Sequence, residues 1–270
     1  MSEKTMVDHA YRRFGTKLAW LVCAGLSLAA DCAGSEDARE ILIETENRHR
    51  TRTQEYSGDL TVVSRQGKER HKAWKSYRDG YAGDSKQLIR FLAPPEVRGV
   101  GFLSVGTAGK NPDQWLYLPS MKRERRIATQ DRESSFVGTD FNFEDMEEFD
   151  QSRYEPRLTG DQVVDGQQCH IIEAFPKEKS VYAKKVLAIR KDVLFLVRME
   201  CFKKDEKDPC KRLVLSDIQQ VDGHWVARKL EMSDLLKGSR TTVVLKEIAF
   251  DRPQPRDRFT LQNLNREEGD

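Results

Sequence analysis

The stretch VLFLVRMEC, residues 193–201, decides the fold of this chain. Its residues alternate between the two faces of an extended strand. One face carries Val193, Phe195, Val197, Met199 and Cys201. The other face carries Leu194, Leu196, Arg198 and Glu200. A period of two over so many residues is typical of a β-strand.

Turn signals recur about every dozen residues on both sides of this stretch, which is the spacing of an antiparallel meander. They fall at residues 165–166, 176–180, 191–192, 202–209, 222–223 and 237–238. The first half adds strand patterns at residues 60–64, 73–78, 88–92, 101–107 and 114–118. The fold class predicted is mainly β (α+β), with about 10–11 strands in one sheet. A meander of this length must curl into an open or closed barrel to bury its apolar face.

Residues 1–34 are predicted to be a signal peptide. Arg12, Arg13 and Lys17 give a positive n-region, and residues 18–30 form an uncharged apolar run followed by small residues. A retained membrane anchor is the alternative, but the run is about half the length that a membrane-spanning helix requires.

A helix is predicted directly behind the signal peptide. Ser35 can cap it, and Ala38, Ile41, Leu42 and Thr45 recur at helical spacing. No clear linker divides the chain after this point. Residues 35–270 are therefore predicted to form a single domain.

The composition narrows the class of protein. Among 270 residues, 46 Lys and Arg balance 44 Asp and Glu, so the formal net charge is +2. A dedicated nucleic-acid binder would show a strong basic excess, and we expect no nucleic-acid partner. The mean hydropathy of −0.70 belongs to a chain whose apolar side chains must be turned inward.

The sequence offers no motif for catalysis, for a cofactor or for a metal ion. It lacks a nucleophile elbow, a phosphate-binding loop and a dinucleotide fingerprint. Its histidines after residue 34 are scattered without ligand spacing, at His49, His71, His170 and His224. We expect no enzyme activity, no catalytic residue, no cofactor and no metal site.

A basic cluster follows an aromatic strand. Trp115 and Tyr117 precede four cations, Lys122, Arg123, Arg125 and Arg126. Such a cluster could hold an anionic headgroup or a protein partner. It could equally be a solvated strand edge, where Lys and Arg discourage edge-to-edge pairing.

The stretch 133–154 interrupts the meander with aromatic residues among acids. Phe141, Phe143 and Met146 could belong to the core, or to a mobile apolar flap that adapts to irregular ligands. The acids lack the spacing of a calcium loop. We expect them to contact the basic cluster.

Two cysteines bracket a charged loop. Cys201 and Cys210 would end adjacent strands of a hairpin, within reach of a disulfide if the chain is exported. The spacing alone does not fix that geometry. Cys169 is expected to be a buried structural thiol.

Several strings of this sequence resemble the outer membrane lipoprotein-sorting protein family, which belongs to the LolA/LolB-like superfamily. They are LIRFLAP (88–94), DQWLYLPSMKR (113–123), SFVGTDF (135–141), DGQQCHIIEA (165–174), and LSD (215–217) with GHW (223–225). The resemblance covers nearly all of residues 35–270, and its central QWLYLP string is quite specific.

The resemblance implies a curved, incomplete antiparallel barrel whose open side is covered by the leading helix and a helical or loop lid. It implies a carrier or chaperone in the periplasm of a Gram-negative bacterium, acting as a monomer. Acyl chains of a lipid or lipoprotein would lie in its cavity on the way to the outer membrane. The residues expected near the cavity or lid are Trp115, Tyr117, Phe141, Phe143, Met146 and Trp225.

The resemblance leaves the cargo and the inward strand face undetermined. A second reading is a lipid-sensing or adaptor subunit of an RND/MMPL-type or ABC lipid exporter, since family members are often associated with such transporters. An envelope hydrolase is a third reading, although no nucleophile–base pair supports it.

Overall fold

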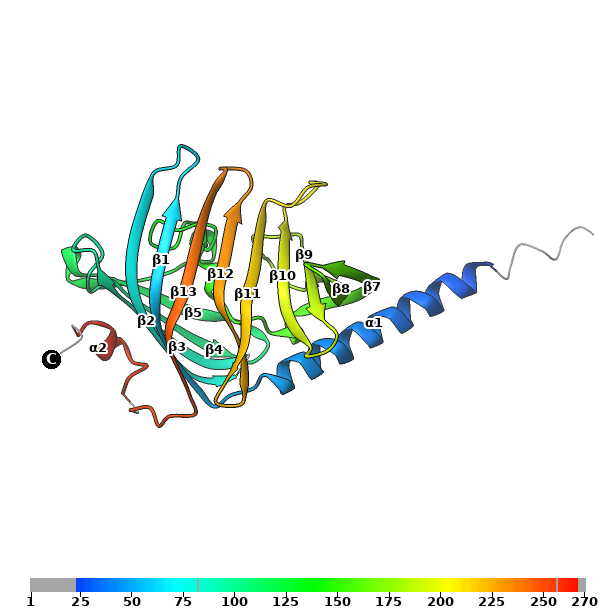
Figure 1. Cartoon of the computed structure of the whole chain (residues 1–270), viewed down its shortest axis with the longest axis horizontal. Coiled ribbons are helices and arrows are strands. Elements are labelled where there is room, and N and C mark those ends of the chain that lie inside the picture. Colours follow the sequence, from blue (N-terminus) through cyan, green and yellow to red (C-terminus); the bar gives the residue numbers. More distant parts are fainter. Residues whose placement is uncertain (1–22, 82, 256, 267–270) are drawn as a thin grey trace, which may run out of the picture.

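The computed structural model of the protein describes residues 23–81, 83–255 and 257–266. These residues form one antiparallel sheet of 13 strands in the order β6-β5-β4-β3-β2-β1-β13-β12-β11-β10-β9-β8-β7. Figure 1 shows the sheet curled into a trough, and β6 and β7 are its two free edges. The prediction of a mainly β, incomplete barrel is therefore confirmed.

The first half of the chain contains one helix and six strands. They are α1 (Cys23–Arg48), β1 (Thr53–Val63), β2 (Glu69–Tyr81), β3 (Asp84–Ala93), β4 (Gly101–Thr107), β5 (Lys110–Leu118) and β6 (Arg123–Arg126). A connecting segment with short 3-10 helices follows, at Thr129–Asp131, Glu144–Met146 and Gln151–Arg153; another 3-10 turn, Pro119–Met121, precedes β6. We call residues 127–153 the lid, because this segment covers the trough.

The second half contains seven strands and a short helix. They are β7 (Tyr154–Val164), β8 (Gln167–Pro176), β9 (Lys184–Arg190), β10 (Phe195–Phe202), β11 (Lys211–Val221), β12 (His224–Asp234), β13 (Ser239–Phe250) and α2 (Leu261–Leu264). Two of the predicted turns are tight hairpins. Asp165-Gly166 and Asp222-Gly223 have positive φ at both residues, which matches the twist of the strands they join.

The described residues form 13 strands, more than the roughly 10–11 that periodicity predicts. Strand β6 is four residues long and reads Arg-Glu-Arg-Arg, so it carries no apolar alternation. It pairs with β5 through the backbone, with Trp115 opposite Arg126 and Leu118 opposite Arg123. Backbone pairing of a wholly charged strand leaves no periodic signal in the sequence.

Helix α1 packs its C-terminal half against the β7 end of the sheet. Ala38 and Leu42 are buried among Ile172, Leu187 and Leu194. The helix predicted behind the signal peptide is therefore confirmed, but it begins earlier than Ser35, at Cys23. The predicted signal peptide falls partly outside the described residues, which start at residue 23. No helix among the described residues is long and apolar enough to cross a membrane.

The sheet buries apolar side chains on both of its faces. On the convex face of β2–β5, Tyr77, Leu88 and Leu103 are covered by Phe259 and Leu264 of the C-terminal segment. Arg90 on the same face lies 3.2 Å from the carbonyl oxygen of Leu264, to which its Nη1 donates. The concave face packs against the lid instead. The C-terminal segment therefore closes the convex face of β2–β5, and a site on these strands can lie only in the trough, between the sheet and the lid.

Candidate cavity inside the half-barrel

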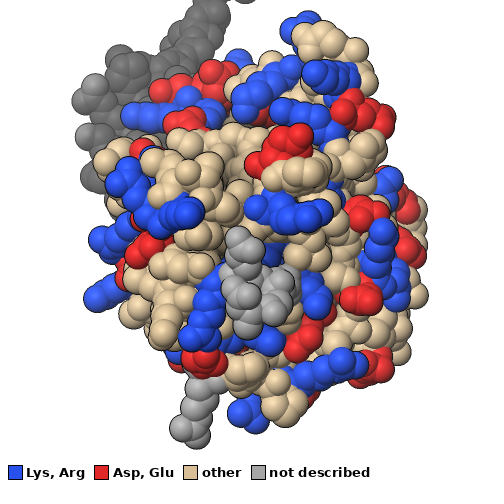
Figure 2. Space-filling view, turned by 90° about the vertical axis from the view of Figure 1, so that its left-hand side faces the viewer, with Lys and Arg blue, Asp and Glu red and all other residues tan. Residues whose placement is uncertain are grey.

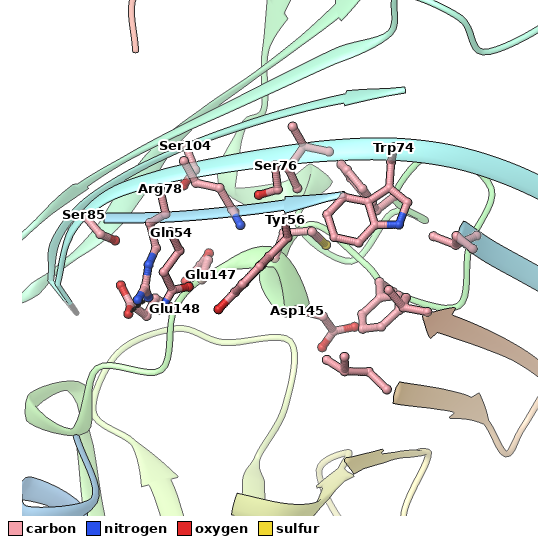
Figure 3. A pocket seen from close by; sticks show the side chains of 18 of the residues that line it. Gln54, Tyr56, Trp74, Ser76, Arg78, Ser85, Ser104, Asp145, Glu147 and Glu148 are labelled. Carbon is pink, nitrogen blue, oxygen red and sulfur yellow. Dashed lines mark hydrogen bonds and ion pairs between the residues drawn. The ribbon is translucent and has the colours of Figure 1, made fainter. Parts of the chain in front are cut away.

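The concave face encloses a cavity of about 300 Å³ between β1–β3, β11–β13 and the lid. Its walls are largely apolar, with Leu60, Trp74, Ile89, Phe91, Phe136, Phe141, Met146, Leu213, Leu230 and Val243 among the lining residues. Figure 3 shows Trp74 and Tyr56 projecting from the strands toward the lid. A volume of this size lies at the lower end of the range typical of small-molecule sites.

The inward positions follow from strand alternation and one irregularity. On β2, Trp74, Ser76 and Arg78 line the cavity, whereas Tyr77 lies in the cluster on the convex face. On β1 the register shifts between Ser57 and Gly58. A Cβ on Gly58 would lie 2.1 Å from the carbonyl oxygen of Val244, so only glycine permits this approach of β1 to β13.

A second cavity of about 290 Å³ adjoins the first and shares Gln54, Tyr56, Trp74, Leu230 and Val243 with it. Its other walls include His49, Phe195, His224, Trp225 and Phe250. Because five residues border both spaces, a ligand that displaces Trp74 or Tyr56 could occupy both.

His49 closes the second cavity at the end of α1. Its Nε2 lies 3.0 Å from the carbonyl oxygens of both Val193 and Leu194, and its Nδ1 is buried without a hydrogen-bond partner. Burial is the main cause that lowers the pKa of His49, and the nearby Arg48 and His224 lower it further. The neutral imidazole is therefore favoured at this position.

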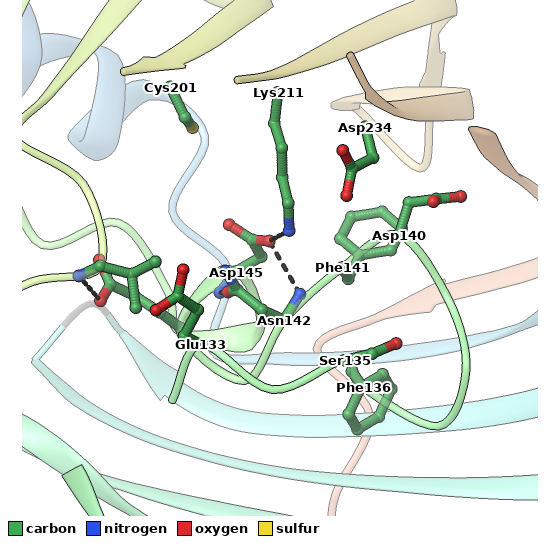
Figure 4. Close-up of polar contacts among 12 residues, drawn as sticks. Glu133, Ser135, Phe136, Asp140, Phe141, Asn142, Asp145, Cys201, Lys211 and Asp234 are labelled. Carbon is green, nitrogen blue, oxygen red and sulfur yellow. Dashed lines mark hydrogen bonds and ion pairs between the residues drawn. The ribbon is translucent and has the colours of Figure 1, made fainter. Parts of the chain in front are cut away.

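Buried charges hold the lid together and tie it to the sheet. Glu147 accepts hydrogen bonds from Arg132 Nε at 2.9 Å and from Arg153 Nη1 at 3.0 Å. Burial raises the pKa of Glu147, although both guanidiniums oppose the shift. Figure 4 shows a second anchor, where Asp145 lies between Lys211 and the backbone of Asn142. These contacts fix the segment that the sequence analysis considered as a mobile flap.

A third anchor joins the lid to β13. Asp140 Oδ2 accepts a hydrogen bond of 2.6 Å from the hydroxyl of Thr241, and Ser239 donates to the other carboxylate oxygen. The acids of residues 133–154 therefore have partners on β2, β11, β13 and the lid itself. Among the described residues none of them pairs with the basic cluster, so the predicted contact is wrong.

The structure separates the predicted cavity residues into four groups. Phe141 and Met146 line the main cavity, and Trp225 lines the second. Phe143 is buried deeper, against Phe102 and Phe136, with an exposed fraction of 2%.

The remaining two predicted cavity residues lie outside the trough. Trp115 and Tyr117 pack with Leu103 and Phe259 on the convex face, so the expectation that they lie near the cavity is corrected. The reason is strand parity, since Gln114 and Leu116 take the inward positions of β5.

The basic cluster lies at the β6 edge of the sheet and away from the cavity. Lys122, Arg123, Arg125 and Arg126 are all exposed. Arg126 pairs with Asp113, and Arg125 lies 3.7 Å from Asp131. On the face shown in Figure 2, acidic and basic side chains are interspersed. The cluster occupies a strand edge, as the second reading of these residues predicted.

The cysteines after residue 34 are free and buried. Cys201 pairs in register with Lys211, so Cys210 is one residue out of register with it. The Sγ of Cys210 lies 3.2 Å from the carbonyl oxygen of Cys201, to which it donates. The disulfide that the spacing left possible between them is not formed in the structure. Among the described residues, no group of three or more side chains could hold a metal ion.

Sequence reasoning missed the residues that contribute most of the wall. Leu60, Trp74, Ile89, Phe91 and Val243 lie on predicted strands, but strand periodicity does not say which of two apolar faces is concave. The polar lining residues Ser76 and Ser104 have mixed neighbours on their faces, Trp74 and Arg78 on β2 and Phe102 and Gly106 on β4, so the sequence carries no clear signal that they are buried.

The chain matches a known protein family in sequence and several solved structures in fold. Residues 83–266 match a family model whose description reads "Uncharacterized protein". No protein among the curated ones matches the chain.

The solved structures that share the fold include the following three. An outer membrane lipoprotein-sorting protein domain from Vibrio parahaemolyticus is 25% identical with a TM-score of 0.81, over 86% of this chain and 100% of that one. A DUF1329 family protein from Desulfovibrio piger is 24% identical with a TM-score of 0.81, over 86% and 99%. A LolA superfamily protein from Nitrosomonas europaea is 18% identical with a TM-score of 0.67, over 83% and 97%.

Proposed function

We propose that this chain is a member of the LolA/LolB-like superfamily and a carrier or chaperone that binds acyl chains, because it shares its fold with an outer membrane lipoprotein-sorting protein domain. Its cargo is a lipid or the lipid anchor of a lipoprotein, held in the trough during transport or sorting toward the outer membrane. The proposed function requires binding without catalysis.

The apolar cavity is the observation that carries this proposal. Trp74, Phe91 and Leu230 project into it from strands of both halves of the sheet, and Phe141 and Met146 project from the lid. Each methylene group moved from water into such a site contributes about 0.8 kcal/mol. A chain of a dozen carbons would thus bind without any specific polar contact.

The proposal also includes the compartment in which the protein works and the partner that supplies its cargo. A carrier of this kind works in the periplasm, which agrees with the signal peptide predicted for residues 1–34. An inner-membrane transporter of the RND/MMPL-like or ABC type is the proposed source of its cargo. The exposed Arg123, Arg125 and Arg126 on the edge strand β6 are proposed as contacts for that partner or for an anionic headgroup.

The test is extraction of the purified protein with organic solvent, followed by mass spectrometry, together with uptake of a fluorescent fatty acid. Copurification of an amphiphile and saturable uptake are expected. If no amphiphile copurifies and no fatty acid binds, the carrier function is wrong. Capture of a transporter by a protein with an empty cavity would instead favour the adaptor reading.

A matched pair of variants ties uptake to the cavity. Val243 lines both cavities, whereas the next residue, Val244, is exposed on the other face of β13. Val243→Phe fills the cavity and is expected to weaken uptake by about tenfold, the effect of losing about 1.4 kcal/mol. Val244→Phe adds the same side chain outside and should leave uptake unchanged.

A further inference from the structure

One row of the concave face is polar across all five strands from β1 to β5. Cross-strand pairing places Gln54 beside Arg78, Arg78 beside Gln87, Gln87 beside Ser104, and Ser104 beside Gln114. We call these five residues the polar row. Opposite residues in a sheet point to the same face, so the five side chains share the inner surface of the trough.

The next two rows toward Trp74 are apolar except for Ser76. Moving along the strands by two residues, Ser76 pairs with Tyr56 and Ile89, and Ile89 pairs with Phe102. Two residues further on, Trp74 pairs with Phe91. The cavity is therefore amphipathic along its length. Figure 3 shows the same division, with Gln54, Arg78, Ser85 and Ser104 at one end and Trp74 at the other.

Several polar groups at this end have no partner within the described residues. The hydroxyls of Ser76 and Ser104 make no hydrogen bond there, although their residues are only 5% and 7% exposed. The side-chain amide of Gln87 is likewise unused, and Glu148 Oε2 is buried without a partner. Gln114 differs, because its amide donates to the carbonyl of Phe143 at 3.0 Å. The indole Nε1 of Trp74, at the other end of the cavity, is also buried without a partner. Buried polar groups are normally satisfied, so the unused groups of Ser76, Gln87, Ser104 and Glu148, which lie close together, point to a ligand.

The charges at this end favour an uncharged ligand. Arg78 is the one Lys or Arg side chain among the described residues that line the main cavity, and it is paired with Glu148. The other lining acids, Asp145 and Glu147, are paired with Lys211, Arg132 and Arg153. A carboxylate or phosphate would find no free cation, and an ammonium would have to compete with Arg78. Burying such an unpaired charge is costly.

We propose that the polar row, together with Ser76 and Glu148, holds an uncharged headgroup rich in hydroxyl or amide groups, such as an acylglycerol. The acyl chain then lies toward Trp74 and Phe91. This inference rests on the proposed carrier function and adds the class of headgroup to it. Two hydroxyls and an amide both donate and accept, whereas Glu148 Oε2 accepts, so a polyol satisfies all four groups.

The experiment compares amphiphiles that share one dodecyl-length chain. Monododecanoylglycerol, dodecanoate and dodecyltrimethylammonium are each titrated, below the critical micelle concentration, against the purified protein loaded with the neutral fluorophore N-phenyl-1-naphthylamine. At about pH 7.5 the fatty acid is ionised. Displacement by the glycerol ester is expected at a concentration at least about tenfold lower than by either charged amphiphile, the effect of two or three hydrogen bonds.

Variants locate the preference. Ser76→Ala with Ser104→Ala should reduce the preference for the glycerol ester to about threefold or less. Binding of the fluorophore should not change, since it uses the apolar end. Ser57→Ala is the matched control, because the Ser57 hydroxyl lies outside the cavity and donates to Glu247 at 2.8 Å. The ranking in the unmodified protein tests the proposal even if the double variant fails to fold.

The outcomes separate the two proposals. If dodecanoate or dodecyltrimethylammonium binds as tightly as the glycerol ester, the inference about the headgroup is wrong and the carrier function stands. A preference that survives the double serine variant would also overturn the assignment to these residues. If neither the fluorophore nor any amphiphile binds, the carrier function fails as well.

Discussion

Asp145 Oδ2 in the lid lies 2.9 Å from Lys211 Nζ at the start of β11, and both side chains are withdrawn from solvent. The same carboxylate accepts a hydrogen bond of 2.7 Å from the hydroxyl of Tyr182 on its other oxygen. Burial is the largest cause that raises the pKa of Tyr182, and Asp145 adds to it, so this hydroxyl remains protonated and donates. One carboxylate thus ties the lid to the second half of the sheet.

Removing Lys211 is expected to destabilise the protein severely. Lys211→Met keeps most of the side-chain volume but leaves the carboxylate of Asp145 buried without its counter-ion, at a cost of about 3–5 kcal/mol. Urea unfolding followed by far-UV circular dichroism measures this loss. Lys246→Met is the control, since Lys246 and Asp59 form an exposed pair whose removal should cost less than about 1 kcal/mol. Equal losses in the two variants would show that the buried pair does not anchor the lid.

Two neighbouring phenylalanines of the lid should separate stability from binding. Phe143 is packed against Phe102 and Phe136, so Phe143→Ala is expected to cost about 3–5 kcal/mol of unfolding free energy. Phe141 is half-buried and lines the cavity, so Phe141→Ala should cost about 1 kcal/mol but weaken fatty-acid binding more. Unfolding in urea and titration with a fluorescent fatty acid give the two readouts. A Phe141→Ala protein with unchanged affinity would remove Phe141 from the site.

The stability of the protein should fall as the pH is lowered through the titration range of histidine. Burial lowers the pKa of His49 in the folded state, whereas the unfolded chain keeps the ordinary value of about 6.5. Below that pH the unfolded state binds the proton first, so the free energy of unfolding decreases until the folded pKa is passed. His49→Phe should flatten this dependence between about pH 7.5 and 5.5. Chemical unfolding at both pH values tests it, with the exposed His71→Gln variant as control.

The thiols of Cys169, Cys201 and Cys210 should react slowly with alkylating reagents in the native protein. Burial raises the pKa of Cys201 to about 12, and it also raises the pKa of Cys169 and Cys210. Because the thiolate is the reactive form, iodoacetamide at about pH 8 should label these positions at least tenfold more slowly than in urea. Peptide mass spectrometry reads each site separately. Peptide masses that do not change on reduction agree with the free thiols of the structure. A reducible link between Cys201 and Cys210 would restore the disulfide that the sequence left possible.

The strand pattern of the second half could be predicted because the turn residues of its hairpins can be recognised in the sequence. Asp165-Gly166 and Asp222-Gly223 carry the residues that positive φ requires, so the meander was visible without tertiary information. The division of faces within β10 was less predictable. A register shift between Leu196 and Arg198 makes Val197 a bulge, so Leu196 and Met199 pack on one cluster although alternation assigned them to opposite faces. Bulges depend on the partner strand, and a single sequence does not show them.

The cavity was harder to predict than the fold for a related reason. Trp115 and Trp74 both lie on apolar-rich strands, and both faces of the β2–β5 sheet are buried, one by the lid and one by the C-terminal segment. Amphipathic alternation distinguishes a buried face from a wet one, but it cannot rank two buried faces. The partners of the lid acids were unpredictable as well, because Asp145 and Lys211 are 66 positions apart in the sequence.

The pairing of β1 with β13 imposes an order on assembly. Thr53 Oγ1 donates to the carbonyl of Arg252 at 2.7 Å, across 199 positions of sequence. Every other pair of adjacent strands in the sheet is joined by a local hairpin, so the strands of each half can pair soon after they are synthesised. The seam between the halves, in contrast, requires closure of the longest loop in the molecule. The first strand of the trough, β1, therefore gains its second neighbour only after β13 has been synthesised, and the two halves enclose their common interior at that point.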